Sequence, residues 1–227
     1  MNCLLTMTGS TIDQIKELQT PKNLSLAILP EKPVSKPEPY GAATTFSELT
    51  KHHHIYLVLH EPSEHTILSV LKPYAKVGLS GVIPTFIRSR ADIERLHAIL
   101  SVAEAAHALQ DGAMKIIPEL GRYPSAFHKL INLSSVSTRL TALTWNEEAL
   151  KLALGAKRSR DDKSNLLPPF QHAQTQCLFI AKSAHLIALD TAPVTPADPE
   201  KSASYGFAGM VGHTLGEARQ MQQVFAA

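Results

Sequence analysis

The feature that most constrains the fold of this chain is a regular alternation of short apolar runs with longer amphipathic segments. Eight runs rich in Ile, Leu and Val have the pattern of strands. The segments between them carry apolar residues at three- and four-residue spacing, which is typical of helices. The expected strands are 3–7, 24–29, 55–59, 81–83, 114–117, 140–143, 186–189 and 209–212. The expected helices are 12–18, 64–76, 93–110, 125–132, 147–154, 170–184 and 215–225.

Eight strands, each followed by a helix-like segment, predict an α/β protein with a single compact (β/α)8 TIM barrel, one domain over residues 1–227. A doubly wound open sheet would also alternate, but no Gly-x-Gly-x-x-Gly follows the first strand. Ser89 and Asp92 predict a capping box, Gly155 a helix stop, and Pro168 and Pro169 a first helical turn.

Composition excludes several classes of protein. The net charge is +2, and the basic run from Lys157 to Arg160 is too short to predict nucleic-acid binding. The apolar runs fall far short of the ~20 residues that span a bilayer, so no membrane partner is expected. No basic leader precedes an apolar stretch at the start. Two cysteines, Cys3 and Cys177, cannot form a disulfide framework, which favours a reduced, cytoplasmic protein.

Several segments follow one another in a distinctive order. They are LPEKPVSK at 29–36, GLSGVIP at 78–84, KIIPE at 115–119, RLTALTW at 139–145, IALDT at 187–191 and YGFAGM at 205–210, followed by His213 and Phe225. As an ordered set they resemble the HpcH/HpaI aldolase and citrate lyase β-subunit family. The resemblance implies a metal-dependent TIM-barrel enzyme that makes or breaks carbon–carbon bonds, and by analogy a homo-oligomer, commonly a trimer.

The resemblance also implies a site in which two carboxylates hold Mg²⁺ against an oxo-acid. Such chemistry builds up enolate charge, which a divalent cation stabilises, and a hard cation prefers oxygen ligands. Glu119 matches the metal-binding glutamate of the family. Glu31 matches what is left of an acidic pair on the second strand, and His213 stands where the family has a His-Pro pair. We expect Glu31 and His213 to be catalytic.

Three further predictions concern substrate and proton transfer. Pro84 and Thr85 stand where the family has a Pro-Lys pair, so we expect them at the substrate. Arg122 lies in a loop near Glu119 and could hold a substrate carboxylate, because its planar fork matches two oxygens; a surface arginine is the alternative. Asp190 ends a strand and could act as an acid or base, or only as a hydrogen-bond partner. Glu31, Glu119 and Asp190 are expected at one rim.

Five positions depart from the family pattern, one of them Thr214, which stands where the family has the proline after its histidine. Ala149 stands where the family has its second metal-binding aspartate, and Ala149 cannot bind a metal. Glu148, one residue earlier, is the candidate replacement, although Glu147 and Glu148 could simply favour the positive end of their helix. The family arginine on the third strand is replaced by Leu57 or Val58, the lysine by Thr85, and Lys32 stands beside Glu31. We therefore expect Mg²⁺ to bind weakly, if it binds at all.

Two other features favour structural roles. The run His52-His53-His54 lies just before a strand and is typical of a solvated loop rather than a metal site. Cys177 falls within an apolar helix, which favours packing over nucleophilic catalysis.

Two functions remain open from the sequence. The first is a carbon–carbon lyase or aldolase with a degenerate metal site, acting on a short oxo-acid or a hydroxyacyl-CoA. The alternative is a catalytically silent barrel that keeps the fold for ligand binding or assembly. The missing second metal-binding carboxylate is the sequence feature that distinguishes these two functions.

Overall fold

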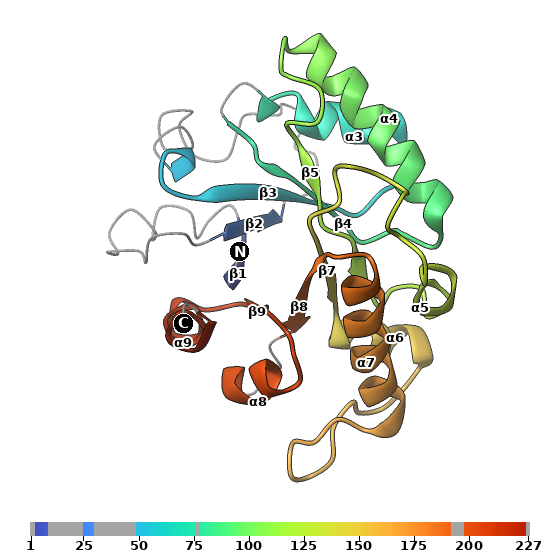
Figure 1. The fold of residues 1–227 in the computed structure, drawn as a ribbon, viewed down its shortest axis with the longest axis vertical. Coiled ribbons are helices and arrows are strands. Elements are labelled where there is room, and N and C mark those ends of the chain that lie inside the picture. Colours follow the sequence, from blue (N-terminus) through green and yellow to red (C-terminus); the bar gives the residue numbers. More distant parts are fainter. Residues whose placement is uncertain (1–2, 9–24, 30–48, 76–77, 192–197, 226–227) are drawn as a thin grey trace.

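The computed structural model describes residues 3–8, 25–29, 49–75, 78–191 and 198–225 (Figure 1). Its strands are β1 (Cys3–Thr8), β2 (Ser25–Leu29), β3 (His54–Leu59), β4 (Gly81–Pro84), β5 (Lys115–Ile116), β6 (Glu119–Leu120), β7 (Ala142–Trp145), β8 (Ile187–Thr191) and β9 (Gly209–Gly212). Its helices are α3 (Glu64–Leu71), α4 (Arg90–Ala106), α5 (Ala126–Lys129), α6 (Glu147–Leu154), α7 (Pro168–Ser183), α8 (Pro199–Ser204) and α9 (Leu215–Phe225). The helix expected at 12–18 lies outside the described residues.

All described strands belong to one parallel sheet with the order β5-β4-β3-β2-β1-β9-β8-β7-β6. In Figure 1 the sheet is curled, and helices such as α4 and α7 lie on its outer side. The prediction of a parallel α/β fold is confirmed. Each expected strand is present within about two residues, because apolar runs bounded by turn residues mark buried parallel strands.

The two edge strands, β5 and β6, are pieces of one extended segment, residues 115–120. This segment bonds on both sides: Ile117 N–H donates to Val82 O (3.0 Å), and Pro118 O accepts from Thr144 N–H (3.0 Å). Ile117 and Pro118 belong to neither strand, and Pro118 has no N–H to donate. The chain thus passes from one edge strand of the curled sheet to the other through Ile117 and Pro118. The expected eight continuous strands are replaced by nine pieces, so a single closed (β/α)8 barrel stays a prediction.

Two cores lie on the two faces of this sheet, because side chains along a strand alternate between faces. The larger core packs the outer face against the helices and includes Val82, Ile116 and Trp145. The smaller core contains no helix residue and fills the inside of the curl. Its buried members are Leu4, Ala27, Tyr56, Val58, Ile83, Ile117, Ala142, Leu189 and Val211.

Most of the helix starts and stops predicted from the sequence are confirmed. The Ser89–Asp92 capping box is present, Pro168 opens α7, and Gly155 ends α6 with a left-handed φ of 63°. Helix α4 ends at Ala106, earlier than expected, and α3 ends at Leu71. Helix α8 was not predicted; it begins with Pro199, after an Asp198 side chain that accepts from Lys201 N–H.

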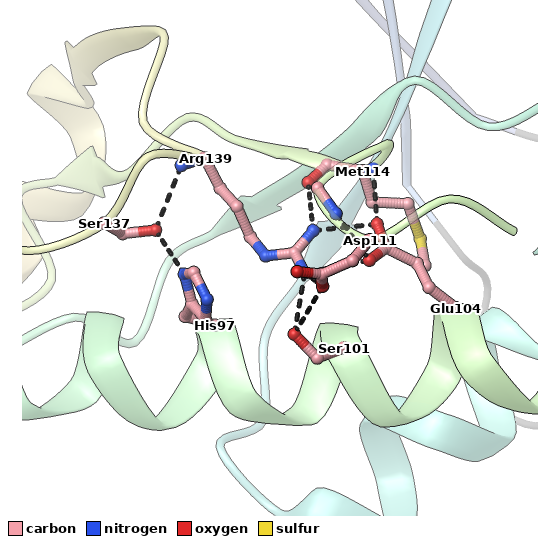
Figure 2. Close-up of polar contacts among 8 residues, drawn as sticks. His97, Ser101, Glu104, Asp111, Met114, Ser137 and Arg139 are labelled. Carbon is pink, nitrogen blue, oxygen red and sulfur yellow. Dashed lines mark hydrogen bonds and ion pairs between the residues drawn. The ribbon is translucent and has the colours of Figure 1, made fainter.

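A buried charge cluster lies at the amino-terminal ends of β5 and β7 (Figure 2). The fully buried Arg139 guanidinium binds both carboxylate oxygens of Glu104 at 2.8 Å, and it also contacts Asp111, Ser101 and the carbonyl of Met114. The Glu104 carboxylate in turn accepts from the N–H groups of Gly112 and Met114. These contacts fix the loop between α4 and β5, which accounts for the early end of α4.

Candidate active site

A cavity of about 1030 Å³ opens at the carboxyl ends of the strands, the end at which parallel α/β barrels carry their active sites. Four residues that end or follow strands line it, namely His60, Asn146, Thr191 and His213, together with Glu119, the first residue of β6. Its floor includes inward-facing core residues such as Val58 and Ile83. Glu148, another predicted site residue, also lines the cavity, so the fold brings Glu119, Glu148 and His213 to one place.

Glu119 is the acidic group on the inner wall of this cavity. It is partly buried, and its Oε1 accepts a hydrogen bond from Asn146 Nδ2 at 3.2 Å. Burial raises the pKa of the Glu119 carboxyl to about 7, and the hydrogen bond from Asn146 opposes that shift. A carboxyl with this pKa can both release and accept a proton near neutral pH.

Asn146 connects Glu119 to the start of α6. Its side-chain oxygen accepts from Ala149 N–H (2.9 Å) as the helix N-cap, while its amide nitrogen donates to Glu119. The backbone of Gly121 packs closely against that of Asn146: a Cβ atom at Gly121 would lie 2.5 Å from Asn146 O. Gly121 also has a φ of 137°, which favours glycine. The chain therefore holds Asn146 and Glu119 in a fixed relation.

The donor set of this cavity does not fit Mg²⁺. Ala149 offers no ligand, and Glu148 forms an ion pair with Lys151 (2.6 Å). Glu147 is bound by Arg160 through two contacts, of 2.8 and 2.6 Å. Within the described ranges, no three His, Cys, Asp or Glu residues form a group that could hold a metal ion. The remaining candidate, Glu31, lies outside the described residues.

The cavity is lined by charged groups of both signs. The basic ones are Lys151, Lys157, Arg158 and Arg160, and Lys151 is already paired with Glu148. Arg160 is held by Glu147 and by Ser164 O, and Arg158 pairs with Asp162 in an exposed contact. Lys157 is exposed and has no charged partner in the described part of the chain. Lys157 can therefore pair with an anionic ligand.

His60 follows β3 and was not singled out from the sequence. Its Nδ1 lies 3.2 Å from Thr85 Oγ1, and its carbonyl accepts from the Arg122 guanidinium at 2.9 Å. Burial lowers the pKa of His60, the charge of Arg122 lowers it further, and Glu61 opposes both. Arg122 and Thr85, both expected at the substrate, thus contact His60, and neither lines the cavity.

His213 and Pro84 complete the predicted set near the strand ends. His213 is exposed at the mouth of the cavity, and its backbone N–H donates to Glu217, which caps α9 together with Thr214. Pro84 is the last residue of β4, is buried and does not line the cavity.

Asp190 lies on the opposite face of the sheet from Glu119, which corrects the expectation of a shared rim. Its neighbours Leu189 and Thr191 point inward, so its own side chain points outward. Burial raises the pKa of Asp190, while four hydrogen bonds to the carboxylate oppose that shift. The donors are Trp145 Nε1, Thr191 N, Gln174 Nε2 and Ser202 Oγ, at 2.6–2.9 Å. This arrangement connects β7, β8, α7 and α8.

Cys177 is placed as expected, whereas the histidine run is only partly a solvated loop, because His53 is buried and His54 begins β3. Cys177 is fully buried in α7, and burial raises the pKa of its thiol well above the usual value. His53 is buried, whereas His52 and His54 are exposed, and none of the three lines the cavity.

No helix in the described part of the chain is long and apolar enough to cross a bilayer. No protein-family model and no curated protein matches the sequence.

Solved structures with the same fold do exist. The citrate lyase beta subunit of M. tuberculosis, complexed with oxaloacetate and magnesium, is 13% identical, with 99% of this chain and 96% of that chain covered and a TM-score of 0.72. Haloferax volcanii malate synthase, in a magnesium/glyoxylate complex, is 14% identical, with 98% and 74% covered and a TM-score of 0.72. RipC of Yersinia pestis is 12% identical, with 99% and 94% covered and a TM-score of 0.68. This chain therefore shares the fold of these proteins over nearly its whole length.

Proposed function

We propose that this chain is a divergent member of the HpcH/HpaI aldolase and citrate lyase β-subunit family and acts as a carbon–carbon lyase or aldolase. Its substrate would be a short oxo-acid or a hydroxyacyl-CoA. The ordered segments in the sequence and the shared fold support membership. The proposal includes a closed (β/α)8 barrel in which residues 115–120 act as one strand, a single domain over 1–227, a cytoplasmic location and a homo-oligomer, with a trimer as the family analogy.

The observation that carries this proposal is the position of Glu119. A carboxyl whose pKa is raised to about 7 stands on the wall of a cavity at the carboxyl ends of the strands, which the exposed Lys157 also lines. Perturbed acids in such cavities are typical of catalytic sites. A short oxo-acid carries a carboxylate that Lys157 can pair with and the carbonyl oxygen that a protonated carboxyl can bind.

The proposed reaction needs proton transfer at two points. In cleavage, the hydroxyl of the substrate gives its proton to solvent, a carbonyl forms there, and the electrons of the broken carbon–carbon bond form an enolate. The enolate oxygen then takes a proton, which Glu119 can supply because it still holds one near neutral pH. Asn146 keeps the other carboxyl oxygen of Glu119 occupied. Since the described donors do not fit Mg²⁺, no step is assigned to a metal.

A catalytically silent barrel is the second candidate, and a specific observation favours it. Ala149 removes the metal-binding position, and Glu148 and Glu147 are each held by a cation of this chain. In that case Glu119 would be a carboxyl kept in an unfavourable place without chemical use.

Product analysis separates the two candidates. The purified protein is mixed with short 4-hydroxy-2-oxo acids and 3-hydroxyacyl-CoA thioesters, with EDTA or with Mg²⁺, and cleavage is followed by proton NMR. We expect cleavage that Glu119→Gln lowers by about 10²- to 10⁴-fold, the usual contribution of a positioned acid or base. Glu94→Gln, an exposed change on α4, is the matched control and keeps the rate. No cleavage of any compound by the wild type would support the silent barrel.

A further inference from the structure

The contacts around His60 involve one rotatable hydroxyl. The Thr85 hydroxyl lies 3.3 Å from Leu59 O and 3.2 Å from His60 Nδ1, and it has one proton. When that proton is donated to Leu59 O, the contact with the ring makes Nδ1 the donor. In the neutral ring Nε2 is therefore the acceptor. Nε2 has no hydrogen-bond partner among the described residues.

Three further observations concern this nitrogen. His60 lines the same cavity as Glu119, at the end of β3, while Glu119 stands on β6. Arg122 binds the carbonyl of His60 and Thr85 contacts its ring, so both the backbone and the side chain of His60 are held in place. Burial and the charge of Arg122 lower the pKa of His60, and Glu61 opposes them, so the net shift favours the neutral ring. A neutral imidazole with a free Nε2 is a proton acceptor.

We propose that His60 Nε2 is the general base of this cavity and takes the proton from the carbon next to the oxo group of a short oxo-acid. This inference rests on the proposed function, since it assumes an oxo-acid in the cavity. Thr85 and Arg122 are then positioning residues that act through His60. The assignment gives the site a base on β3 and an acid on β6.

The step balances without a cofactor. The C–H bond breaks, its proton goes to Nε2, and its electron pair forms the carbon–carbon double bond of an enol. The former carbonyl oxygen takes the proton of the Glu119 carboxyl. Imidazolium and carboxylate then exchange protons with solvent, and reversal returns the oxo-acid. In D₂O each cycle replaces one methyl proton of pyruvate by deuterium.

Nitrogen-15 NMR of the histidine rings tests the geometry independently of any reaction. We expect His60 to be protonated at Nδ1, whereas the exposed His65 of α3 serves as the ordinary reference. Thr85→Val should abolish this preference, because it removes the acceptor. Thr141→Val is the matched control: Thr141 Oγ1 is also buried, without a hydrogen-bond partner, just ahead of β7, and it does not line the cavity. A His60 ring protonated at Nε2 would overturn the inference.

Deuterium exchange into pyruvate in D₂O with EDTA tests the base. We expect the wild type to accelerate exchange over buffer, and His60→Gln to lower the enzymatic rate by about 10²- to 10⁴-fold. Thr85→Val should lower it by about tenfold, the effect of one ordinary hydrogen bond, and Thr141→Val should not change it.

The outcomes separate this inference from the proposed function. Exchange that depends on His60, without cleavage of any carbon–carbon bond, would support the base and contradict the lyase. Cleavage or exchange that is unchanged in a folded His60→Gln variant would overturn the base. Absence of exchange in the wild type would overturn it as well.

Discussion

Two acidic sites at opposite ends of the curled sheet, the Arg139–Glu104 pair and Glu119, have opposite surroundings. At the amino-terminal end, Arg139 and Glu104 are almost fully buried and make a dense set of mutual and backbone contacts (Figure 2). At the carboxyl end, Glu119 receives one hydrogen bond, from a neutral amide. A buried charge is tolerated when it is paired and bonded, and its pKa shifts when it is not. The first end is built for stability, and the second keeps a carboxyl that can exchange its proton.

The largest effect is expected at the amino-terminal end. Arg139→Met leaves the Glu104 carboxylate buried without its cation, which costs about 3–5 kcal/mol for a buried pair broken on one side. Urea unfolding measures this loss. Arg158→Gln, which breaks an exposed pair with Asp162, is the control and should leave the unfolding midpoint nearly unchanged. Equal effects of the two changes would contradict the contrast between the ends.

The second effect concerns Glu119, where substitution is expected to raise the stability of the protein rather than lower it. Its pKa rises from 4.5 to about 7 on folding, so the folded protein binds the proton more tightly than the unfolded chain. Stability is therefore fully present below pH 4.5 and falls as the pH rises to 7, by up to about 3 kcal/mol. Glu119→Gln should remove this fall and stabilise the protein at pH 8.

Melting curves between pH 4 and pH 8 check this expectation, with Glu94→Gln as the control. The two variants and the wild type should agree at pH 4, where the Glu119 carboxyl is protonated. A Glu119→Gln variant that is less stable at pH 8 would show that the carboxylate has a partner that the account lacks.

Much of the fold follows from the sequence, because parallel strands are short apolar runs and helices carry their own caps. The position of Glu119 at a strand end also follows. The face of the sheet on which the Asp190 side chain lies could not be predicted. Strands buried on both faces are apolar at successive positions, so the sequence does not show which positions point inward. His60 was missed because its partners, Thr85 and Arg122, lie 25 and 62 residues away. The division of residues 115–120 into two strands was also missed. It arises because β5 pairs with β4 whereas β6 pairs with β7.

The third effect falls on the residue that joins the cavity to α6. Asn146→Ala removes the N-cap of α6 and should lower stability by about 1 kcal/mol. It should also raise the pKa of Glu119 further, because the lost hydrogen bond favoured the carboxylate. Asn146→Ser keeps a capping oxygen, so it should preserve stability while still raising that pKa. An unchanged pKa in both variants would argue against the contact.

The smallest effect is expected at His60. Burial is the main cause of its lowered pKa, and the charge of Arg122 adds to it. Arg122→Gln should therefore raise the pKa of His60 only part of the way to its usual value, and so reduce the neutral fraction near pH 6. Proton NMR titration measures this, and Arg95→Gln, exposed on α4, is the control. An unchanged or lower pKa in Arg122→Gln would contradict the assignment.

The central claim is that Glu119 is a proton-exchanging carboxyl rather than a metal ligand. Carbon-13 NMR of the glutamate carboxyl groups, titrated against pH with and without millimolar Mg²⁺, tests it most directly. We expect the Glu119 pKa near 7 in both titrations, since the described donors do not fit the cation. A Glu119 pKa near 4.5, or one that Mg²⁺ lowers by a unit or more, would contradict the claim.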